Sequence, residues 1–305
     1  MQNKHSGKVI DNVDDVDILE CEQCGFIHVN PIPTIEELTT TYRHDYYEKT
    51  KPLSLTRYME DEAWYQIQYA DRYDTFEEQL GTKQLGEEKN RILDVGCGPG
   101  LFLKCGKERG WNTVGIEPST QAAEKARSFG IETIEDFLTP ETAKPLGQFD
   151  AVHTSLVLEH IPNPIEFIQT INRLTKPGGL ICVTAPNEYN PFQQALREED
   201  NYKPWWIVPT HHLNYFTPDS LSNLLEKSGY EIILRENTFP IDIFLLMGDN
   251  YVGQDQMGRA CHKKRIRFEQ TLHKAGLNPL KRKIYRAFTE LGLGREVCLY
   301  ARKIS

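Results

Sequence analysis

The sequence predicts an α/β fold in which a mostly parallel, seven-stranded sheet carries helices on both faces. The first observation is a short apolar run at residues 91–95, of the kind that a buried parallel strand shows. The second is a turn with glycines at 96, 98 and 100, followed by a helical segment at 101–109. The third is the alternation of strand-like and helix-like segments that continues from there, as in parallel sheets. A strand, a glycine turn and a helix begin a nucleotide-binding α/β domain.

The composition limits the classes of protein to which the chain can belong. Its 305 residues suit one sizeable domain with additions, or two domains, and 39% hydrophobic residues is an ordinary globular value. The net charge of -9 disfavours a general nucleic-acid binder. Because the sequence shows no secretion signal, membrane span or disulfide pattern, we expect a cytoplasmic protein without nucleic-acid or membrane partners. The oligomeric state is not predicted.

Residues 1–52 read as an N-terminal extension with a C-x-x-C-G turn at 21–25, which is a type of turn that grips zinc. A structural zinc site needs four ligands, and no second C-x-x-C lies nearby, so that His5 and His28 are the only close candidates. We therefore expect no bound metal, with Cys21 and Cys24 as the residues that a metal would use. The alternative is a turn with two buried thiols.

Residues 53–90 read as a helical lid or linker. Before them, within the N-terminal extension, Thr34 is expected to cap a helix that runs towards Tyr42. Residues 55–85 are expected to form one or two helices, with Trp64 and Phe76 among their apolar positions, before a polar linker at 86–90.

The glycine loop and the strand after it indicate the nucleotide. The glycines are spaced G-x-G-x-G after Asp94, whereas the dinucleotide fingerprint is G-x-G-x-x-G, and Phe102 stands at the position of its third glycine. This spacing disfavours NAD and FAD. Residues 113–116 read as the second strand, and Glu117 at its end is placed to accept hydrogen bonds from both hydroxyls of a ribose.

The remaining elements of the sheet follow in order. We expect a helix at 118–128, a strand at 131–134, a strand at 149–154, a helix from 164 and, after the turn Lys176-Pro177-Gly178-Gly179, a strand at 180–184. A helix from about 217 and a strand at 230–234 come next. Residues 296–302 alternate well enough to be the final antiparallel strand, which makes residues 238–295 a helical insertion with helices at 241–247, 256–274 and 279–291.

Several of these stretches resemble class I S-adenosylmethionine (SAM)-dependent methyltransferases. The resemblance rests on D-x-G-x-G-x-G at 94–100, on F-D-x-V … L-E-H-I at 149–161 and on K-P-G-G at 176–179. It covers residues 91–185 closely and 211–235 more loosely. It implies a Rossmann-like class I methyltransferase fold, with 91–237 as the SAM-binding core, 186–216 as an acceptor-side insert and 296–305 as the final strand.

The resemblance also implies which residues bind the cofactor, SAM. Asp136 would meet the adenine amino group, Phe137 would stack on the adenine, and Ser155 and Leu156 would lie near the methionine part. The full set of expected cofactor residues is Asp94, Gly96, Cys97, Gly98, Gly100, Glu117, Pro118, Asp136, Phe137, Ser155 and Leu156. The segment Asp45-Tyr46-Tyr47 either folds over this pocket, as in similar enzymes, or docks the N-terminal extension on the main domain.

The expected catalytic residues are His160, His212 and Glu159. An alcohol acceptor has to lose a proton, and a neutral histidine within hydrogen-bond reach can take it. Glu159 and His160 belong to the L-E-H-I motif, and His212 lies in H-x-N-Y-F-T, which resembles a segment of small-molecule methyltransferases. An amine acceptor would need no base, and a histidine in a loop can be purely structural.

The acceptor is expected to lie against the insert at 186–216. Flat aromatic faces with polar edges suit sugar rings or aromatic acceptors, although Trp205 and Trp206 can instead form a small core of their own. The expected substrate residues are Tyr189, Phe192, Trp205, Trp206, His211 and Tyr215. Basic residues at 259–267 and 281–283 can meet a phosphorylated acceptor or form solvated helix faces.

The sequence therefore predicts a SAM-dependent methyltransferase that modifies a hydroxyl or amine of a small-molecule acceptor. A sugar, a nucleotide-linked sugar or a natural product is the first expectation, which places the protein in polysaccharide biosynthesis. A quinone- or lipid-type O-methyltransferase is the alternative within the same class. Two other classes stay open, namely a non-catalytic SAM-binding scaffold and an NAD-dependent oxidoreductase.

Overall fold

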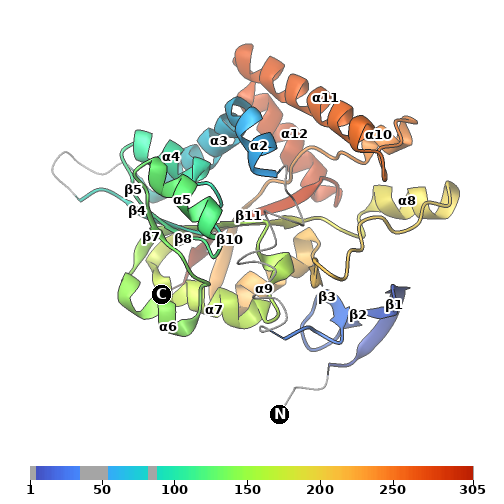
Figure 1. The fold of residues 1–305 in the computed structure, drawn as a ribbon, viewed down its shortest axis with the longest axis horizontal. Coiled ribbons are helices and arrows are strands. Elements are labelled where there is room, and N and C mark those ends of the chain that lie inside the picture. The colour runs from blue at the N-terminus through green and yellow to red at the C-terminus, as the bar shows by residue number, and fades with distance from the viewer. Residues whose placement is uncertain (1–4, 35–53, 82–87, 305) are drawn as a thin grey trace.

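A central seven-stranded sheet organises the molecule in the computed structural model, which describes residues 5–34, 54–81 and 88–304 (Figure 1). The strand order is β10-β11-β8-β7-β4-β5-β6, and only β11 runs antiparallel to its neighbours. The strands are β4 (Arg91–Val95), β5 (Asn112–Ile116), β6 (Glu132–Ile134), β7 (Phe149–Ser155), β8 (Thr175–Pro186), β10 (Tyr230–Arg235) and β11 (Glu296–Lys303).

Helices cover both faces of this sheet because the buried strands are apolar on both sides. One face packs against α6 (Pro140–Ala143), α7 (Pro164–Leu174) and α9 (Pro218–Lys227). The other face packs against α3 (Glu62–Leu80), α4 (Leu101–Glu108) and α5 (Thr120–Ser128). Along β4 the side chains alternate accordingly, with Leu93 and Val95 in the first core and Ile92 in the second.

A second, four-stranded sheet carries the N-terminal part of the chain and lies apart from the main sheet in Figure 1. It consists of β1 (Gly7–Val13), β2 (Val16–Cys21), β3 (Ile27–Asn30) and the two-residue strand β9 (Asn214–Tyr215), all antiparallel. Its apolar face forms a separate small core with Ile18, Val29, Trp206, Leu213 and Tyr215. The N-terminal strands therefore reach the main domain through β9.

The predicted fold class is confirmed, including the antiparallel strand at the end of the chain and the helices that precede it. Between β10 and β11 lie α10 (Ile243–Leu246), α11 (Asp255–Lys274) and α12 (Asn278–Glu290). The short 3-10 helices are η2 (Lys144–Leu146) and η3 (Leu158–His160), and α2 (Ser54–Glu60) precedes α3. No helix within the described residues is both long and apolar enough to cross a membrane.

Some local expectations differ from the structure. The turn expected at 176–179 lies inside β8, which begins at Thr175 and shifts its register against β7 between Phe149 and Ala151. The insert after β8 contains a helix, α8 (Pro191–Glu199), whose start is capped by the Asn190 side chain. The expected helix from Thr34 to Tyr42 and the segment Asp45-Tyr46-Tyr47 lie outside the described residues, apart from Thr34 itself.

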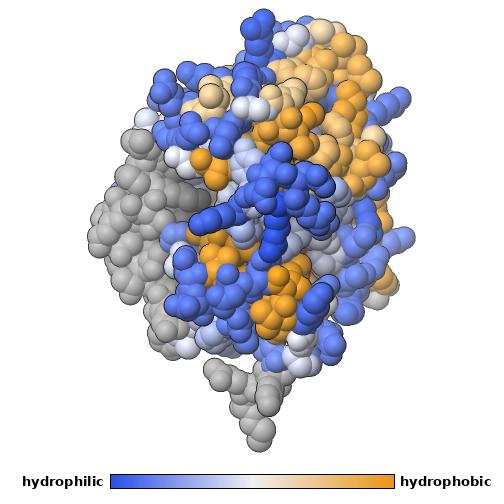
Figure 2. Space-filling model, turned by 90° about the vertical axis from the view of Figure 1, so that its right-hand side faces the viewer, coloured by the Kyte–Doolittle hydropathy of each residue, from blue (hydrophilic) through white to orange (hydrophobic). Residues whose placement is uncertain are grey.

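The surface that faces right in Figure 1 is mixed in character. Figure 2 shows hydrophobic side chains in separate areas divided by polar ones. Single exposed apolar side chains such as Val9 and Met247 are ordinary on a folded protein, so they do not by themselves indicate a site.

Candidate active site

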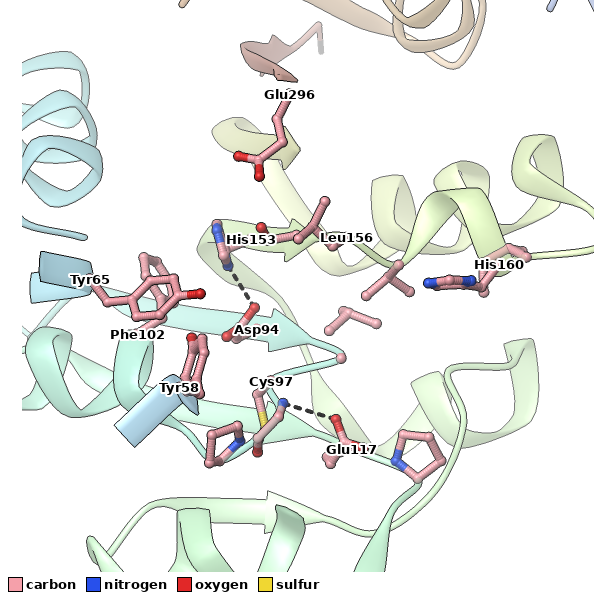
Figure 3. A pocket seen from close by; sticks show the side chains of 18 of the residues that line it. Tyr58, Tyr65, Asp94, Cys97, Phe102, Glu117, His153, Leu156, His160 and Glu296 are labelled. Carbon is pink, nitrogen blue, oxygen red and sulfur yellow. Dashed lines mark hydrogen bonds and ion pairs between the residues drawn. The ribbon is translucent and has the colours of Figure 1, made fainter. Parts of the chain in front are cut away.

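A cavity of about 1700 Å³ lies beyond the carboxyl ends of the parallel strands. Open α/β sheets bind their ligands at this edge. The glycine loop, the end of β5, the residues that follow β7 and the end of η3 line one side of it, and side chains from α2, α3 and α11 line the other. Figure 3 shows that groups from separate parts of the chain, among them Tyr65, Asp94, Glu117 and His160, point into the same space.

The predicted cofactor residues meet in this cavity. It is lined by Asp94, Gly96, Cys97, Gly98, Glu117, Pro118, Asp136, Phe137, Ser155 and Leu156. Gly100 is not among the lining residues. It is the N-cap of α4 and has a left-handed conformation with φ of 79°. Leu156 has a positive φ of 56°, which is uncommon for a branched side chain and fixes the chain direction directly after β7.

Gly96 is needed where β4 turns into the loop. Its φ is +74°, and a Cβ atom there would lie 2.3 Å from Cγ2 of Val157. A larger residue would therefore combine backbone strain with a clash. The loop that results brings the Gly98 amide to Glu117.

Glu117 is held at the end of β5 by two backbone amides. Gly98 N–H donates to Oε2 at 2.9 Å (Figure 3), and Ser119 N–H donates to Oε1 at 3.0 Å. Burial raises the pKa of this carboxyl from 4.5 to about 7, against the lowering effect of both amides. Each oxygen retains a second lone-pair direction, so the carboxylate can still accept from ribose hydroxyls.

Asp94 is oriented by a buried relay that the sequence analysis did not assign. His153 Nδ1–H donates to Asp94 Oδ1 at 2.6 Å, and Arg72 of α3 donates to His153 Nε2 at 2.7 Å. Burial lowers the pKa of His153, which favours the neutral ring that this arrangement requires. Phe102 stacks on the same ring at 3.8 Å between centroids. Phe102, which stands at the position of the third fingerprint glycine, thus packs against His153.

His160 lies on the cavity wall with one ring nitrogen fixed. Its Nδ1–H donates to the backbone carbonyl of His211 at 2.6 Å, so Nε2 carries the lone pair when the ring is neutral. Glu159 Oε1 lies 3.7 Å from Nε2, and the His160 and His212 rings are 5.3 Å apart. The three predicted catalytic residues are therefore neighbours, with Glu159 and His212 behind His160 rather than on the cavity lining.

Glu188 is a buried neighbour of His212 that sequence reasoning missed as a site residue. Its Oε1 lies 3.4 Å from His212 Nδ1. Burial raises the pKa of Glu188 to about 8, while Arg295 lowers it and Asp242 raises it. The sequence signal that could have identified Glu188 is its position two residues after the end of β8, where acidic residues of other strands line the cavity.

The cluster of Glu159, His160 and His212 can have one of two chemical roles. His160 can take a proton from an acceptor hydroxyl. Alternatively, Glu159, His160 and His212 can hold a divalent cation, since one ligand atom from each lies within 4.8 Å of the others.

Aromatic side chains from α2 and α3 form the wall opposite the glycine loop. Tyr65 lies 4.2 Å from Tyr58, 4.7 Å from Trp64 and 5.8 Å from Tyr69 between ring centroids. The Tyr58 and Tyr69 hydroxyls form a hydrogen bond with each other. The periodicity of this segment predicted its helices, but not that this face would line the cavity.

Three basic residues of α11, Arg259, His262 and Arg265, also line the cavity, but each lies beside a carboxylate. Arg259 donates to Asp61 at 2.6 Å, and His262 Nε2 lies 3.2 Å from the same carboxylate. Arg265 pairs with Glu269 one turn along the same helix, whereas Lys281 and Arg282 form ion pairs with Asp71 and Glu236, which belong to other parts of the fold. The basic run thus serves contacts between elements, which weakens the case for a phosphate site.

The aromatic residues of the insert at 186–216 lie elsewhere. Tyr189, Trp205, Trp206 and Tyr215 pack with the N-terminal sheet, and the lining of the large cavity includes none of the expected substrate residues. The backbone carbonyl of His211 accepts from His160, and Phe192 lies on α8. The alternative of a small separate core describes this packing, so the expectation of acceptor contacts remains a prediction without support from the cavity.

The sequence profile of the methyltransferase-domain family matches residues 64–234. This match covers more than half of the chain, and the chain belongs to that family. It confirms the predicted class of protein and, with it, SAM as the cofactor of that class. The NAD-dependent alternative is correspondingly disfavoured.

Two curated relatives carry the name ubiquinone biosynthesis O-methyltransferase. The protein of Roseobacter denitrificans (strain ATCC 33942 / OCh 114) is 32% identical over 153 residues, which cover 48% of this chain and 62% of the relative. That of Ruegeria pomeroyi (strain ATCC 700808 / DSM 15171 / DSS-3) is 32% identical over 165 residues, covering 50% of this chain and 66% of the relative. The chain thus spans somewhat less than two thirds of these relatives.

Among solved structures, the plantazolicin methyltransferase BamL, in complex with a triazolic desmethylPZN analogue and SAH, is similar to this chain. Its TM-score is 0.51 with 18% sequence identity, covering 88% of this chain and 94% of BamL. At this level of identity the likeness concerns the fold alone.

Proposed function

We propose that this protein binds SAM and transfers its methyl group to a hydroxyl of a small-molecule acceptor. The observation that carries the proposal is the placing of His160. His160 lines the same cavity as Glu117, Asp136 and Leu156, and the His211 carbonyl holds its Nδ1–H. The family match and the names of the curated relatives support the same reaction.

In this proposal the enzyme mainly positions the reactants. Methyl transfer is an in-line displacement, so acceptor oxygen, methyl carbon and sulfur must be collinear and close. The oxygen forms a bond to the methyl carbon while the sulfur–methyl bond breaks, and S-adenosylhomocysteine leaves with the bonding electron pair. The hydroxyl proton passes to Nε2 of His160 and then to solvent.

An aromatic or quinone-type hydroxyl is the acceptor that the cavity favours. Tyr58, Trp64, Tyr65 and Tyr69 offer flat apolar faces to a ring, and such faces bind other rings in stacked or edge arrangements. The O-methylation in the names of the curated relatives supports this choice. The first expectation, a sugar in polysaccharide biosynthesis, rested on aromatic residues that pack with the N-terminal sheet instead.

A sugar or nucleotide-linked sugar remains a second candidate because polar groups also line the cavity. Gln68, Arg259 and Glu296 can exchange hydrogen bonds with sugar hydroxyls. We also infer a small molecule rather than a nucleic acid, which the net charge of -9 supports. The seven free thiols favour a reducing compartment such as the cytoplasm.

The test is methyl transfer from isotope-labelled SAM to a panel of acceptors, followed by mass spectrometry of the products. The panel contains catechols and hydroxyquinols with and without an apolar tail, free sugars and nucleotide-linked sugars. We expect label on a phenolic oxygen. Label only on sugars would favour the second candidate, and SAM binding without transfer to any class of acceptor would favour a scaffold.

A matched control separates loss of cofactor from loss of chemistry. Gly96→Ala places a methyl group 2.3 Å from Val157, so we expect it to lose SAM binding by calorimetry and transfer together. Binding of NAD in place of SAM by the unaltered protein would overturn the proposal.

A further inference from the structure

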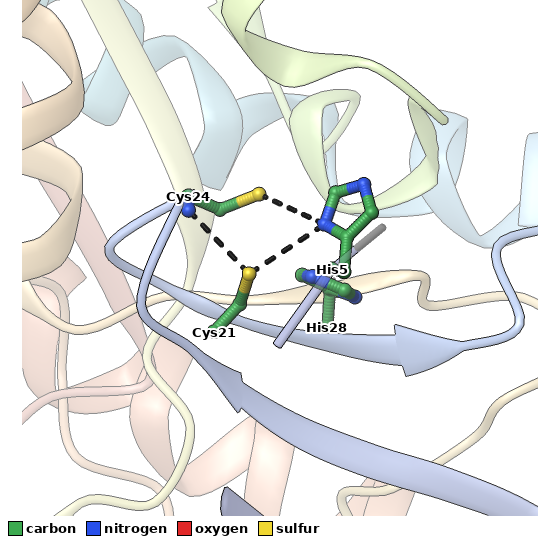
Figure 4. A group of neighbouring side chains, drawn as sticks. All are labelled: His5, Cys21, Cys24 and His28. Carbon is green, nitrogen blue, oxygen red and sulfur yellow. Dashed lines mark hydrogen bonds between the residues drawn. The ribbon is translucent and has the colours of Figure 1, made fainter. Parts of the chain in front are cut away.

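Four side chains with metal-binding atoms meet at one end of the N-terminal sheet, far from the glycine loop in sequence (Figure 4). His5 precedes β1, Cys21 ends β2, Cys24 lies in the following turn and His28 lies in β3. One ligand atom from each lies within 4.8 Å of the others. The sequence offered one C-x-x-C and two separate histidines, and the fold of β1, β2 and β3 brings the histidines to the thiols.

The spacing of these atoms fits a tetrahedral metal. His5 Nδ1 lies 3.5 Å from Cys21 Sγ and 3.4 Å from Cys24 Sγ. In a tetrahedral zinc site, bonds of about 2.3 Å to sulfur and about 2.1 Å to nitrogen put these ligand atoms about 3.6 Å apart. The contacts are therefore close to the edges of such a tetrahedron.

The turn holds both cysteines in the required direction. Cys24 N–H points at Cys21 Sγ at 3.4 Å, and Gly25 N–H donates to the Cys21 carbonyl at 2.9 Å. Gly25 has a φ of +76°, which lets the chain reverse sharply after the second cysteine. An amide directed at a sulfur stabilises negative charge there, which is the state of a metal-bound thiolate.

His28 has a nitrogen that the fold leaves without a partner. The side chain is 0% exposed, and Nδ1–H donates to the Val29 carbonyl at 2.8 Å. That bond leaves the lone pair on Nε2, which is buried and has no hydrogen-bond partner among the described residues. A carbonyl that fixes one ring nitrogen while the other binds metal is the usual outer-shell arrangement of metal-binding histidines.

His5 is held over the thiols by its neighbour. Ser6 N–H donates to Gln23 Oε1 at 2.8 Å, and the Ser6 carbonyl accepts from Glu22 N–H at 3.0 Å. Both partners lie inside the C-x-x-C turn. The position of His5 is thus tied to the same few residues as the cysteines.

We propose that His5, Cys21, Cys24 and His28 bind one structural zinc ion. Two thiolates and two imidazoles are a ligand set that selects Zn²⁺, and four protein ligands leave no open position for water or substrate. The site is independent of the proposed methyl transfer. Its effect is to fasten the start of β1, the end of β2 and β3 to one another.

Hydrogen bonds connect this fastening to the candidate active site. His28 pairs with Asn214 in β9, and Val29 N–H donates to the Leu213 carbonyl at 2.9 Å. The Asn214 side chain donates to the carbonyls of Leu158 at 3.1 Å and Ile161 at 2.8 Å, which flank His160. Metal loss should therefore loosen the segment that positions His160, while leaving the glycine loop intact.

The first experiment measures zinc in the purified full-length protein by mass spectrometry under native conditions and by elemental analysis. We expect one zinc per chain. Replacement by Co²⁺ should give the visible spectrum of a tetrahedral site with thiolate-to-cobalt charge transfer. A folded protein that takes up neither ion would overturn the proposal, as would a Cys21–Cys24 disulfide in protein kept under reducing conditions.

Variants identify the ligands. Cys24→Ser and His28→Gln should each bind zinc at least 10-fold more weakly, whereas Cys261→Ser, which removes a buried thiol of α11, should bind it normally. If a ligand variant fails to fold, competition of the unaltered protein with a chromophoric chelator still measures the affinity. Equal zinc content in all variants would exclude these ligands. Because these readouts do not use activity, they stay valid if the proposed methyl transfer fails.

Discussion

Glu117 must be charged to accept well from a ribose, yet its burial favours the neutral form. Its pKa is raised from 4.5 to about 7 in the folded protein, so the folded state holds a proton that the unfolded state releases between these values. The contribution of this group to stability is therefore present at low pH and is lost as pH rises through about 7. SAM binding has the opposite dependence.

We expect the affinity for SAM to rise with pH up to about 7, by as much as roughly tenfold per pH unit, and then to level off. The physical reason is that the neutral Glu117 carboxyl must release its proton before the resulting carboxylate can accept hydrogen bonds from the ribose. Calorimetry between pH 5.5 and 8.5 measures this. Glu117→Gln should bind SAM about 10- to 100-fold more weakly at pH 8, with a flatter profile. An unchanged profile in that variant would assign the titration to another group.

His160 and His212 can be separated by kinetics. His160→Ala should lower kcat by about 100-fold or more at unchanged SAM affinity, because it removes the proposed base. His212→Ala should have a smaller effect, because His212 lies behind His160 and next to Glu188. If both variants lose activity equally, and a chelator abolishes the activity of the unaltered protein, Glu159, His160 and His212 bind a metal instead.

At the residue scale, the sequence predicted groups that follow strands directly. Glu117 was expected because an acidic residue at the end of the strand after the glycine loop can accept from a ribose, and Asp136 was expected from the resemblance to class I methyltransferases. Both line the cavity. The hydrogen bonds from Arg72 to His153 and from His153 to Asp94 could not be predicted from the sequence. Arg72 is 81 residues from His153 and reaches it only when α3 packs on the sheet. A buried polar contact between distant elements leaves no local pattern.

Between elements, a buried ion pair joins α3 to α12. Lys281 Nζ lies 2.5 Å from Asp71 Oδ2, and the side chains are 1% and 12% exposed. Burial raises the pKa of Asp71 against the lowering effect of Lys281, so the carboxylate depends on its partner. The α12 helix belongs to the insertion before β11, and this ion pair attaches that insertion to α3.

Asp71→Leu should lower the free energy of unfolding by about 3–5 kcal/mol, because it leaves the Lys281 charge buried and unpaired. Adding Lys281→Met should recover most of that loss, as two apolar side chains can pack in place of the pair. Urea unfolding of the single and double variants measures both effects. Asp219→Ala, which removes an exposed pair with Arg235, should change nothing measurable. A double variant that is no more stable than Asp71→Leu would contradict this account.

At the element scale, periodicity predicted long helices and buried strands but missed short strands that exist through pairing. β9 has two residues, and it is a strand only because it pairs with β3. The paired residues Ile27 and Tyr215 are 188 positions apart, so no local sequence pattern describes this sheet. The same partner explains Trp206 and Tyr215, whose aromatic faces suggested ligand contacts but pack in that sheet's core.

For the whole molecule, the N-terminal sheet is part of the folded unit rather than an appendage. Phe26, in the turn before β3, is 4% exposed and belongs to the main core, where its ring lies 5.1 Å from Phe216. Removal of the Phe26 side chain should therefore affect the unfolding of the entire chain.

We expect Phe26→Ala to cost about 3–5 kcal/mol in the unfolding of the whole molecule, as for other buried aromatic residues. The measurement is urea unfolding followed by circular dichroism and by tryptophan fluorescence, which should give coincident transitions. Val9→Ala in β1, where the side chain is 49% exposed, serves as the control and should have little effect. Two separate transitions would show that the N-terminal sheet unfolds independently.

The position of β11 has a consequence for biosynthesis. It lies between β8 and β10, yet its residues, Glu296–Lys303, are made long after both neighbours. A nascent chain that has emerged as far as α12 therefore leaves one edge of β8 unpaired and β10 without its neighbour in the sheet, and both are open to wrong pairing with other chains. We expect ribosome-arrested chains ending before residue 296 to be cleaved readily by protease and to recruit chaperones. Arrested chains that extend β11 beyond the exit tunnel should be resistant, and equal sensitivity of both would contradict a late closure of the sheet.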